Sequence, residues 1–174
     1  MEKKTIYLVI ELKVREFVAK LLFAYHASLR GYRVYLGSRE KIIDLIKSKN
    51  KKAGIFFYKA GLQVDKTIEI SKKIDNHIVL DEEMTAGLNT ERYYKNAKAF
   101  FPKTLNYISA FFYVNQIISK IVLKEINVKN VYGIGWPRVD LFQKNYSKIY
   151  LDEAQKIKKK YGKFFLFMSD LGFI

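Results

Sequence analysis

Three consecutive carboxylates are the residues of this sequence best suited to acid–base chemistry. Asp81, Glu82 and Glu83 directly follow an apolar run at residues 77–80. Neighbouring carboxylates disfavour each other's ionisation, so one of them can accept the proton of a hydroxyl group near neutral pH as a general base. The same trio could instead stabilise the positive end of a helix. Spacing alone does not single out one of the three residues.

Two further pairs of charged residues could bind a polar or anionic substrate. Arg15 and Glu16 begin the first predicted helix, where phosphate-binding loops occur, but the glycines of a dinucleotide fingerprint are absent. They either line the edge of a cleft or form an ion pair in the first helical turn. Arg138 and Asp140 follow Pro137, and a planar guanidinium suits phosphate. The alternative for this pair is an internal salt bridge that locks the turn.

The histidines and the missing cysteines narrow the possible chemistry. The sequence contains no cysteine, which excludes disulfides, thiolate metal sites and thiol nucleophiles. His26 and His77 are far apart in the sequence, so a zinc site is not expected. His26 lies between apolar residues of a predicted helix and is expected to be half-buried, while staying a candidate for substrate binding. His77 begins a predicted strand and is expected at the surface. We expect neither a metal nor a cofactor.

The elements that must position these side chains follow from the apolar patterns. Runs typical of buried strands occupy residues 5–12, 32–36, 53–58, 77–80, 110–114 and 128–134. Helical patterns lie between them, at residues 14–29, 38–46, 64–74 and 116–125. This alternation predicts an α/β fold of Rossmann-like type, in which helices cover both faces of a parallel sheet in three layers. Ligands bind at the carboxyl ends of such strands, which is where the charged residues lie.

The first predicted helix has one apolar face. Its apolar residues recur at spacings of three and four: Val14, Phe17, Val18, Leu21, Leu22, Tyr25 and Leu29. A stripe of this kind is typical of a helix that packs against a core. We therefore expect this face to be buried against the sheet.

The chain changes character after residue 131. Residues 131–142, VYGIGWPRVDLF, predict a strand that turns at Gly133 and Gly135 and enters a short helix with Pro137 in its first turn. Residues 151–161 have a charged amphipathic pattern, and residues 163–168, KFFLFM, form another buried-type strand. We expect one domain at residues 1–145, a linker helix at 146–162 and the first strand of a truncated second domain at 163–174. If that strand instead joined the first sheet, it would be an exposed apolar edge.

The chain is strongly basic, with 32 lysines and arginines, 17 acidic residues and a net charge of +15. Such a charge suits nucleic acid or an anionic membrane face, whereas lysines spread along a whole chain are typical of solvated surfaces. No nucleic-acid-binding signature is present, so no nucleic acid partner is expected. The longest mostly apolar stretch, residues 105–123, is interrupted by polar residues, and a membrane span needs about 20 apolar ones. We expect a cytoplasmic protein. The positive charge would also allow peripheral contact with the inner face of an anionic membrane.

Three segments carry a resemblance to a known family. They are residues 9–38, VIELKVREFVAKLLFAYHASLRGYRVYLGS, residues 79–84, VLDEEM, and residues 133–140, GIGWPRVD. In this order they resemble the N-terminal region of bacterial surface carbohydrate biosynthesis proteins, which build capsule and lipopolysaccharide. These are glycosyltransferases of the GT-B type, with two Rossmann-like domains, and are distantly similar to CDP-glycerol glycerophosphotransferases. The resemblance covers nearly the whole chain, although the Trp-Gly pair expected near Asn115 is missing.

The resemblance implies transfer of a sugar or polyol phosphate from a nucleotide-activated donor to a glycan or lipid-linked acceptor. In this architecture the first domain holds the acceptor and often the catalytic base, while the second domain binds the nucleotide. The chain then corresponds to the acceptor side. Because most of the second domain is absent, the chain alone is expected to be inactive.

Two other functions stay open at the level of sequence. One is a non-enzymatic basic α/β domain that binds anionic partners, either nucleic acid or a membrane surface; it predicts basic residues clustered on one face with aromatic residues between them. The other is a phosphoacceptor regulator with a flavodoxin-like strand order. Such a regulator usually has paired acidic residues after its first strand, whereas here Glu11 stands with Lys13.

Overall fold

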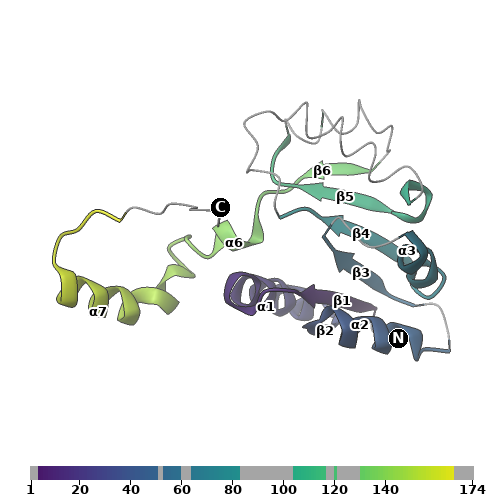
Figure 1. Ribbon diagram of the computed structural model, residues 1–174, viewed down its shortest axis with the longest axis horizontal. Coiled ribbons are helices and arrows are strands. Elements are labelled where there is room, and N and C mark those ends of the chain that lie inside the picture. Colours follow the sequence, from purple (N-terminus) through teal and green to yellow (C-terminus); the bar gives the residue numbers. More distant parts are fainter. Residues whose placement is uncertain are drawn as a thin grey trace, which may run out of the picture. The chain divides into compact units, whose positions relative to one another are not determined.

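Six parallel strands form the centre of the protein. The computed structural model describes residues 4–50, 53–59, 64–82, 104–116, 120 and 130–166. The sheet has the order β2-β1-β3-β4-β5-β6, and every neighbouring pair is parallel. Its strands are β1 (Thr5–Ile10), β2 (Arg33–Ser38), β3 (Ile55–Tyr58), β4 (Asn76–Leu80), β5 (Ala110–Tyr113) and β6 (Val131–Gly133). All six fall on the predicted runs (Figure 1).

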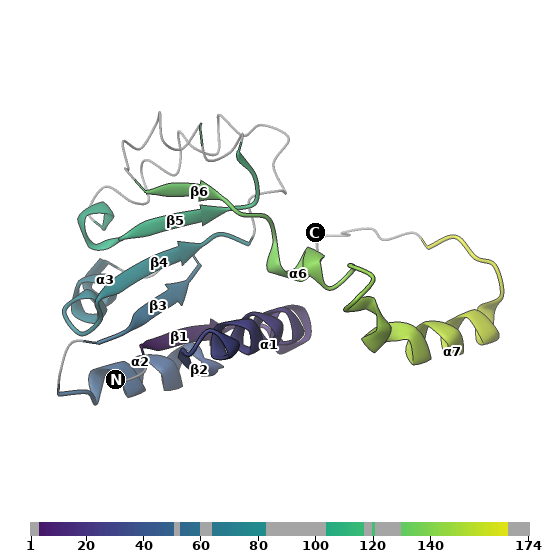
Figure 2. The same ribbon diagram turned by 180° about the vertical axis from the view of Figure 1, so that it is seen from behind.

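Helices cover both faces of this sheet, which confirms the predicted α/β Rossmann-like fold with three layers (Figures 1 and 2). Helix α1 (Lys13–Leu29) packs on β1 and β2 from one side. Helices α2 (Arg39–Lys47) and α3 (Val64–Ser71) contact each other over the opposite face. Helix α3 is shorter than predicted, because residues 72–74 leave the helix and lead into β4. The predicted helix at residues 116–125 falls mostly outside the described residues.

The strand order reverses between β1 and β3. The chain passes from β1 through α1 to β2 on one side, and from β2 through α2 to β3 on the other side of β1. The first five strands share the flavodoxin-like order 2-1-3-4-5, which differs from the 3-2-1-4-5-6 order of dinucleotide-binding domains. In open α/β sheets a reversal of this kind opens a crevice at the carboxyl ends of the strands, where ligands bind.

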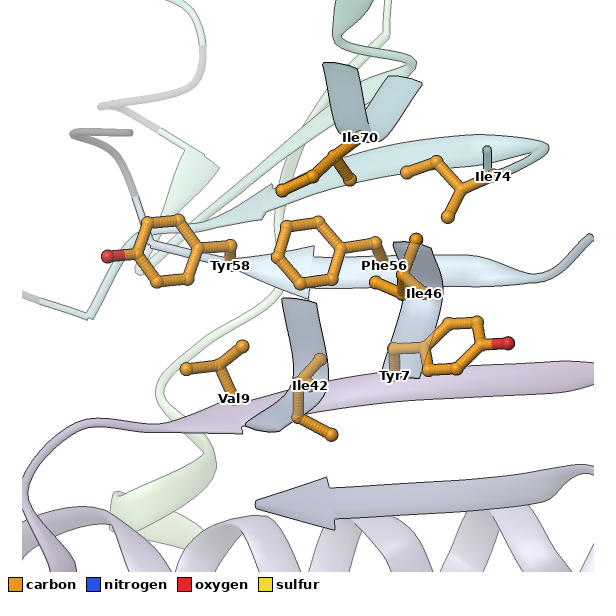
Figure 3. Close-up of a cluster of buried hydrophobic side chains, with 8 residues drawn as sticks. All are labelled: Tyr7, Val9, Ile42, Ile46, Phe56, Tyr58, Ile70 and Ile74. Atoms are coloured by element: carbon orange, nitrogen blue, oxygen red, sulfur yellow. The ribbon is translucent and has the colours of Figure 1, made fainter. Parts of the chain in front are cut away.

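Strand β1 has a continuous apolar sequence because the hydrophobic core lies on both of its faces. Tyr7 and Val9 point to the α2 and α3 side, while Ile6 and Leu8 point to the α1 side, and all four are buried. A strand covered on both faces needs apolar residues at every position. On the α2 and α3 side, eight buried side chains interlock (Figure 3): Tyr7, Val9, Ile42, Ile46, Phe56, Tyr58, Ile70 and Ile74.

Helix α1 is turned the opposite way from the prediction. Its buried residues are Glu16, Ala19, Lys20 and Ala27. The predicted apolar face points largely to solvent, since Val14, Val18, Leu21, Tyr25 and Leu29 are 38% to 100% exposed. A spacing of three and four identifies a helical stripe but does not identify its partner. Here Ala19, Ala27, the half-buried Phe23 and a buried ion pair face the sheet instead.

His77 also departs from the prediction, because it is buried rather than at the surface. Its ring lies 5.1 Å from the ring of Phe56, and its backbone N–H donates to Ser109 Oγ at 3.2 Å. His77 is the second residue of β4, an interior strand flanked by β3 and β5. Its ring is buried because it packs beside Phe56, a member of the buried cluster on the α2 and α3 side.

Gly133 and Gly135 serve different conformational needs around β6. Gly135 has a φ of +88°, in the left-handed region that favours glycine. Gly133 lies against backbone, because a Cβ built there would lie 2.3 Å from the carbonyl carbon of Asn115 and 2.4 Å from the amide nitrogen of Gln116. Both glycines are therefore required by the turn that leads to Pro137.

Replacing Gly133 with alanine is expected to lower the free energy of unfolding by about 1–3 kcal/mol or more, since backbone rather than a mobile side chain must move aside. Urea unfolding measures this change. Gly37→Ala is the matched control within β2, because its added Cβ would meet only Ile42 at an ordinary 3.7 Å. Equal stability of the two variants would contradict the close approach at Gly133.

The chain divides into two compact units, residues 1–139 and 140–174. Helix α6 (Pro137–Asp140) spans the boundary between them. It begins with Pro137, as predicted. The second unit contains the 3₁₀ helix η2 (Ser147–Tyr150) and helix α7 (Leu151–Tyr161), which ends at Gly162 with a φ of +66°. Residues 163–166 form no strand and are exposed; the rest of the predicted strand lies outside the described residues. Among the described helices, none combines the length and apolar character needed to cross a bilayer.

Candidate functional site

A buried cluster of three charges lies where α1 meets the end of β4. Lys20 Nζ is 2.8 Å from Glu16 Oε2 and 3.1 Å from Glu82 Oε2. No more than 7% of any of these side chains is exposed. Glu16 and Lys20 are one turn apart on α1, and Glu82 follows β4 at the carboxyl edge of the sheet. We call Glu16, Lys20 and Glu82 the buried triad.

The carboxylate of Glu16 is held firmly in its ionised form. Burial by itself would raise the pKa of Glu16, but hydrogen bonds from Lys20, the Glu11 backbone N–H and Arg15 together lower it to about 2. The Glu11 N–H lies 2.9 Å from Glu16 Oε2, and Arg15 Nη2 lies 3.2 Å from Glu16 Oε1. This carboxylate fixes the turn from β1 into α1. It is unsuited to accept a proton near neutral pH.

A second, more accessible cluster lies between the ends of β1 and β3. Tyr58 Oη donates to Glu11 Oε1 at 2.5 Å, and Lys59 Nζ lies 2.5 Å from Glu11 Oε2. Arg39 Nη1 lies 3.9 Å from the same carboxylate and 3.5 Å from Tyr58 Oη. We call Glu11, Arg39, Tyr58 and Lys59 the switch-point cluster, because they lie where the strand order reverses.

Partial burial and hydrogen bonding set the ionisation of the switch-point cluster. Burial alone would raise the pKa of Glu11, yet hydrogen bonds from Lys59 and Tyr58 lower it below the ordinary value. Burial and the neighbouring Glu11 carboxylate raise the pKa of Tyr58. The cluster therefore offers a neutral phenol, an ionised carboxylate and two cations. About a fifth of Glu11 and Lys59 is exposed, at 22% and 19%, and 44% of Arg39.

Arg138, which follows β6, contacts Glu82 at the carboxyl edge of the sheet. Its Nη2 donates to the backbone carbonyl of Glu82 at 2.7 Å, and its guanidinium lies 4.8 Å from the ring centre of Trp136. The indole N–H of Trp136 is buried and has no hydrogen-bond partner in the described part of the chain. The expected ion pair between Arg138 and Asp140 is not formed among the described residues. Asp140 Oδ1 accepts instead from Gln143 Nε2 at 3.0 Å.

The structure gathers most of the predicted site residues at the carboxyl edge, but not all of them. Asp81 and Glu82 are buried there. Glu16 is joined to Glu82 through Lys20, and Arg15 contacts Glu16. Glu83 lies outside the described residues. His26 is half-buried as predicted, but it lies near the other end of α1, against the ring of Tyr25. Asp140 belongs to the second unit.

Sequence reasoning missed the cations that complete the site. Lys20 was not among the predicted site residues, although its spacing of four from Glu16 is that of a helical ion pair. Lys59 and Glu11 stood at predicted strand ends, but only the pairing of β1 with β3 brings them together. Arg39 opens α2 next to β1 for the same reason. In the described part of the chain, no three His, Asp or Glu side chains come together in a way that could hold a metal ion.

The two clusters place charged groups of both signs along one edge of the sheet. The buried triad anchors the loops after β1 and β4, and the accessible switch-point cluster presents donors and acceptors to solvent. Fixed groups of both charge signs suit a ligand rich in hydroxyl and anionic groups. No family model, curated protein or solved structure matches the chain.

Proposed function

We propose that the chain is the acceptor side of a glycosyltransferase-like protein of bacterial surface polysaccharide biosynthesis. Its carboxyl edge would bind a glycan or lipid-linked acceptor. A sugar or polyol phosphate would come from a nucleotide-activated donor held by a second domain. The proposal rests on the family resemblance and on the placement of the residues that carry it.

One observation carries the proposal: the three resembling segments meet at Glu82. Lys20, from the first segment, binds the Glu82 carboxylate at 3.1 Å. Arg138, from the third segment, donates to the Glu82 carbonyl at 2.7 Å. Glu82 itself belongs to the second segment. Segments far apart in the sequence thus come together at the edge where α/β sheets bind ligands, as expected if they share one function.

The contacts divide the acidic trio into different roles. Glu82 is neutralised by Lys20, so we assign it to holding the edge together. Asp81 is buried at the same edge, with its N–H donating to the Phe112 carbonyl at 2.9 Å. Asp81 and Glu83 stay the candidates for the general base. Arg39, Lys59 and Arg138 are the cations that would orient an acceptor or stabilise the leaving diphosphate.

The second unit exposes a run of apolar side chains after α7. Phe164, Phe165 and Leu166 are 52%, 96% and 73% exposed, and residues 163–166 form no strand. The first strand of a second domain therefore stays a prediction, and the proposal rests on the carboxyl edge of the first unit.

Binding measurements test the proposal on the chain itself. We expect one member of a panel of bacterial surface oligosaccharides to bind in saturation-transfer NMR, and Arg39→Ala to weaken that binding about tenfold through loss of a charged hydrogen-bond donor. Lys66→Ala is the matched control, since Lys66 is an exposed cation of α3. Tight binding of CDP-glycerol or UDP-glucose, with no oligosaccharide bound, would show that the chain is not an acceptor side.

The base assignment is tested by transfer activity after the chain is joined to a donor-binding domain of the family it resembles. Asp81→Asn is expected to lower transfer by about 10²- to 10⁴-fold, the usual contribution of a general base, without loss of stability. Glu82→Gln is the comparison, because it should act on stability through Lys20. Full activity of both Asp81→Asn and Glu83→Gln would remove these two residues as the base.

A further inference from the structure

The outward face of α1 is a continuous apolar stripe without a partner in the described structure. Val14, Val18, Leu21, Tyr25 and Leu29 lie at spacings of four, three, four and four, so they share one side of the helix. Their exposed fractions are 100%, 38%, 48%, 56% and 65%. The side of α1 that packs on the sheet lies opposite, at Glu16, Ala19, Lys20 and Ala27. We call the five exposed residues the α1 stripe.

The exposed charged residues of α1, together with the residue directly after it, are all positive. The only acidic residue of α1 is Glu16, and it is buried in the triad. Lys13 and Arg15 in the first turn of the helix and Arg30 directly after its end are exposed. An apolar stripe with a tyrosine and with flanking lysine and arginine has the composition of a surface that inserts into the headgroup region of an anionic bilayer.

These charges argue against a second copy of the chain as the partner. If two α1 helices packed antiparallel, Lys13 of one copy would lie beside Arg30 of the other. If they packed parallel, Lys13 of one chain would face Lys13 of the other, and Arg30 would face Arg30. Like charges that face each other across an interface are unfavourable. An anionic lipid surface instead pairs with the cations and buries the stripe.

We propose that the α1 stripe docks the protein on an anionic membrane surface, with Val18, Leu21 and Tyr25 in the headgroup region and with Lys13 and Arg30 on lipid phosphates. This inference goes beyond the proposed transfer reaction and does not depend on it. Docking through one face of α1 leaves the carboxyl edge of the sheet open to solvent or to a lipid-linked ligand.

Vesicle co-sedimentation tests this proposal. The protein is expected to bind vesicles of phosphatidylcholine mixed with phosphatidylglycerol, and to bind pure phosphatidylcholine much more weakly. Leu21→Asp is expected to reduce partitioning about 10- to 100-fold, since it removes one apolar side chain from the lipid-facing stripe. The pair Lys13→Glu and Arg30→Glu is expected to reduce it at least about tenfold, through loss and reversal of charge near the surface.

Matched variants separate lipid docking from general effects. Ile134→Asp removes an equally exposed apolar side chain after β6, at the other edge of the sheet. Lys41→Glu and Lys66→Glu reverse two exposed cations on α2 and α3. Both sets should bind vesicles like the unaltered protein. The docking assignment is overturned if Leu21→Asp binds as well as these controls. It is also overturned if binding to vesicles does not increase when phosphatidylglycerol is added. A dimer in light scattering that Leu21→Asp dissociates would overturn it as well.

Discussion

Replacement of Lys20 with methionine is expected to destabilise the protein by about 3–5 kcal/mol, the usual cost of removing one partner from a buried ion pair. The side chain of Lys20 is 7% exposed and lies within 3.1 Å of two carboxylates. Methionine fills a similar volume but removes the cation that lies between Glu16 and Glu82, and Arg15 remains in contact with Glu16 alone. Urea unfolding at neutral pH measures the loss, which is among the largest expected for a single residue here.

Two comparisons show whether this loss comes from unpaired charge. The triple variant Glu16→Gln, Lys20→Met and Glu82→Gln removes all three charges, and it should recover most of the lost stability, since neutral isosteres can replace a buried ionic cluster at little cost. Lys41→Met changes an exposed lysine of α2, so it should stay within about 0.5 kcal/mol of the unaltered protein. If Lys20→Met behaves like Lys41→Met, the triad does not hold the β1 and β4 loops together.

Burial of His77 is expected to make the protein less stable in mild acid. Burial lowers the pKa of His77 from 6.5 to about 4, and its Nδ1 has no hydrogen-bond partner among the described residues. The unfolded chain therefore takes up a proton between pH 6.5 and pH 4 that the folded protein does not. The resulting stability is fully present above pH 6.5 and is lost as the pH falls toward 4. The loss amounts to about 3 kcal/mol.

Replacing His77 with leucine should flatten the stability profile in this pH window. The charged side chains of Lys72 and Asp75 line the same surface hollow as His77. The Asp75 carboxylate accepts a hydrogen bond from the Gly54 N–H at 2.7 Å. Glu16→Gln is the matched comparison, because the pKa of Glu16 is lowered to about 2. Its contribution is present above the unfolded pKa of about 4.3 and is lost only as the pH falls below that value. Glu16→Gln should thus keep the His77 transition, and an unchanged profile in His77→Leu would refute its assignment to His77.

The strands and helices could be predicted because each depends on local pattern. The run at residues 5–12 predicts β1, where buried residues point to both sides of the sheet. Pro137 and Gly162 mark the start of α6 and the end of α7. The gathering of candidate residues at the carboxyl edge could also be predicted, since chain direction in a parallel sheet brings the residues after β1 and β4 to one side.

The partners of individual side chains could not be predicted in this way. Arg138 was expected to pair with Asp140, yet it donates to the Glu82 carbonyl, which becomes a neighbour only after β6 is placed in the sheet. Glu11 and Lys59 lie at the ends of two predicted strands, and they form an ion pair because β1 and β3 are neighbours in the sheet. Such contacts join residues that are distant in the sequence, and no periodicity within one segment encodes them.

Helix α1 shows the division between these two levels most clearly. Its sequence determines a helix from Lys13 to Leu29 with an apolar side and a side that contains Glu16 and Lys20. Which side faces the sheet was decided by the tertiary structure. Lys20 finds Glu82 at the end of β4, and the small residues Ala19 and Ala27 allow the helix to lie against the strands. The gain from a paired buried charge and close packing depends on the partner surface, which local sequence does not describe.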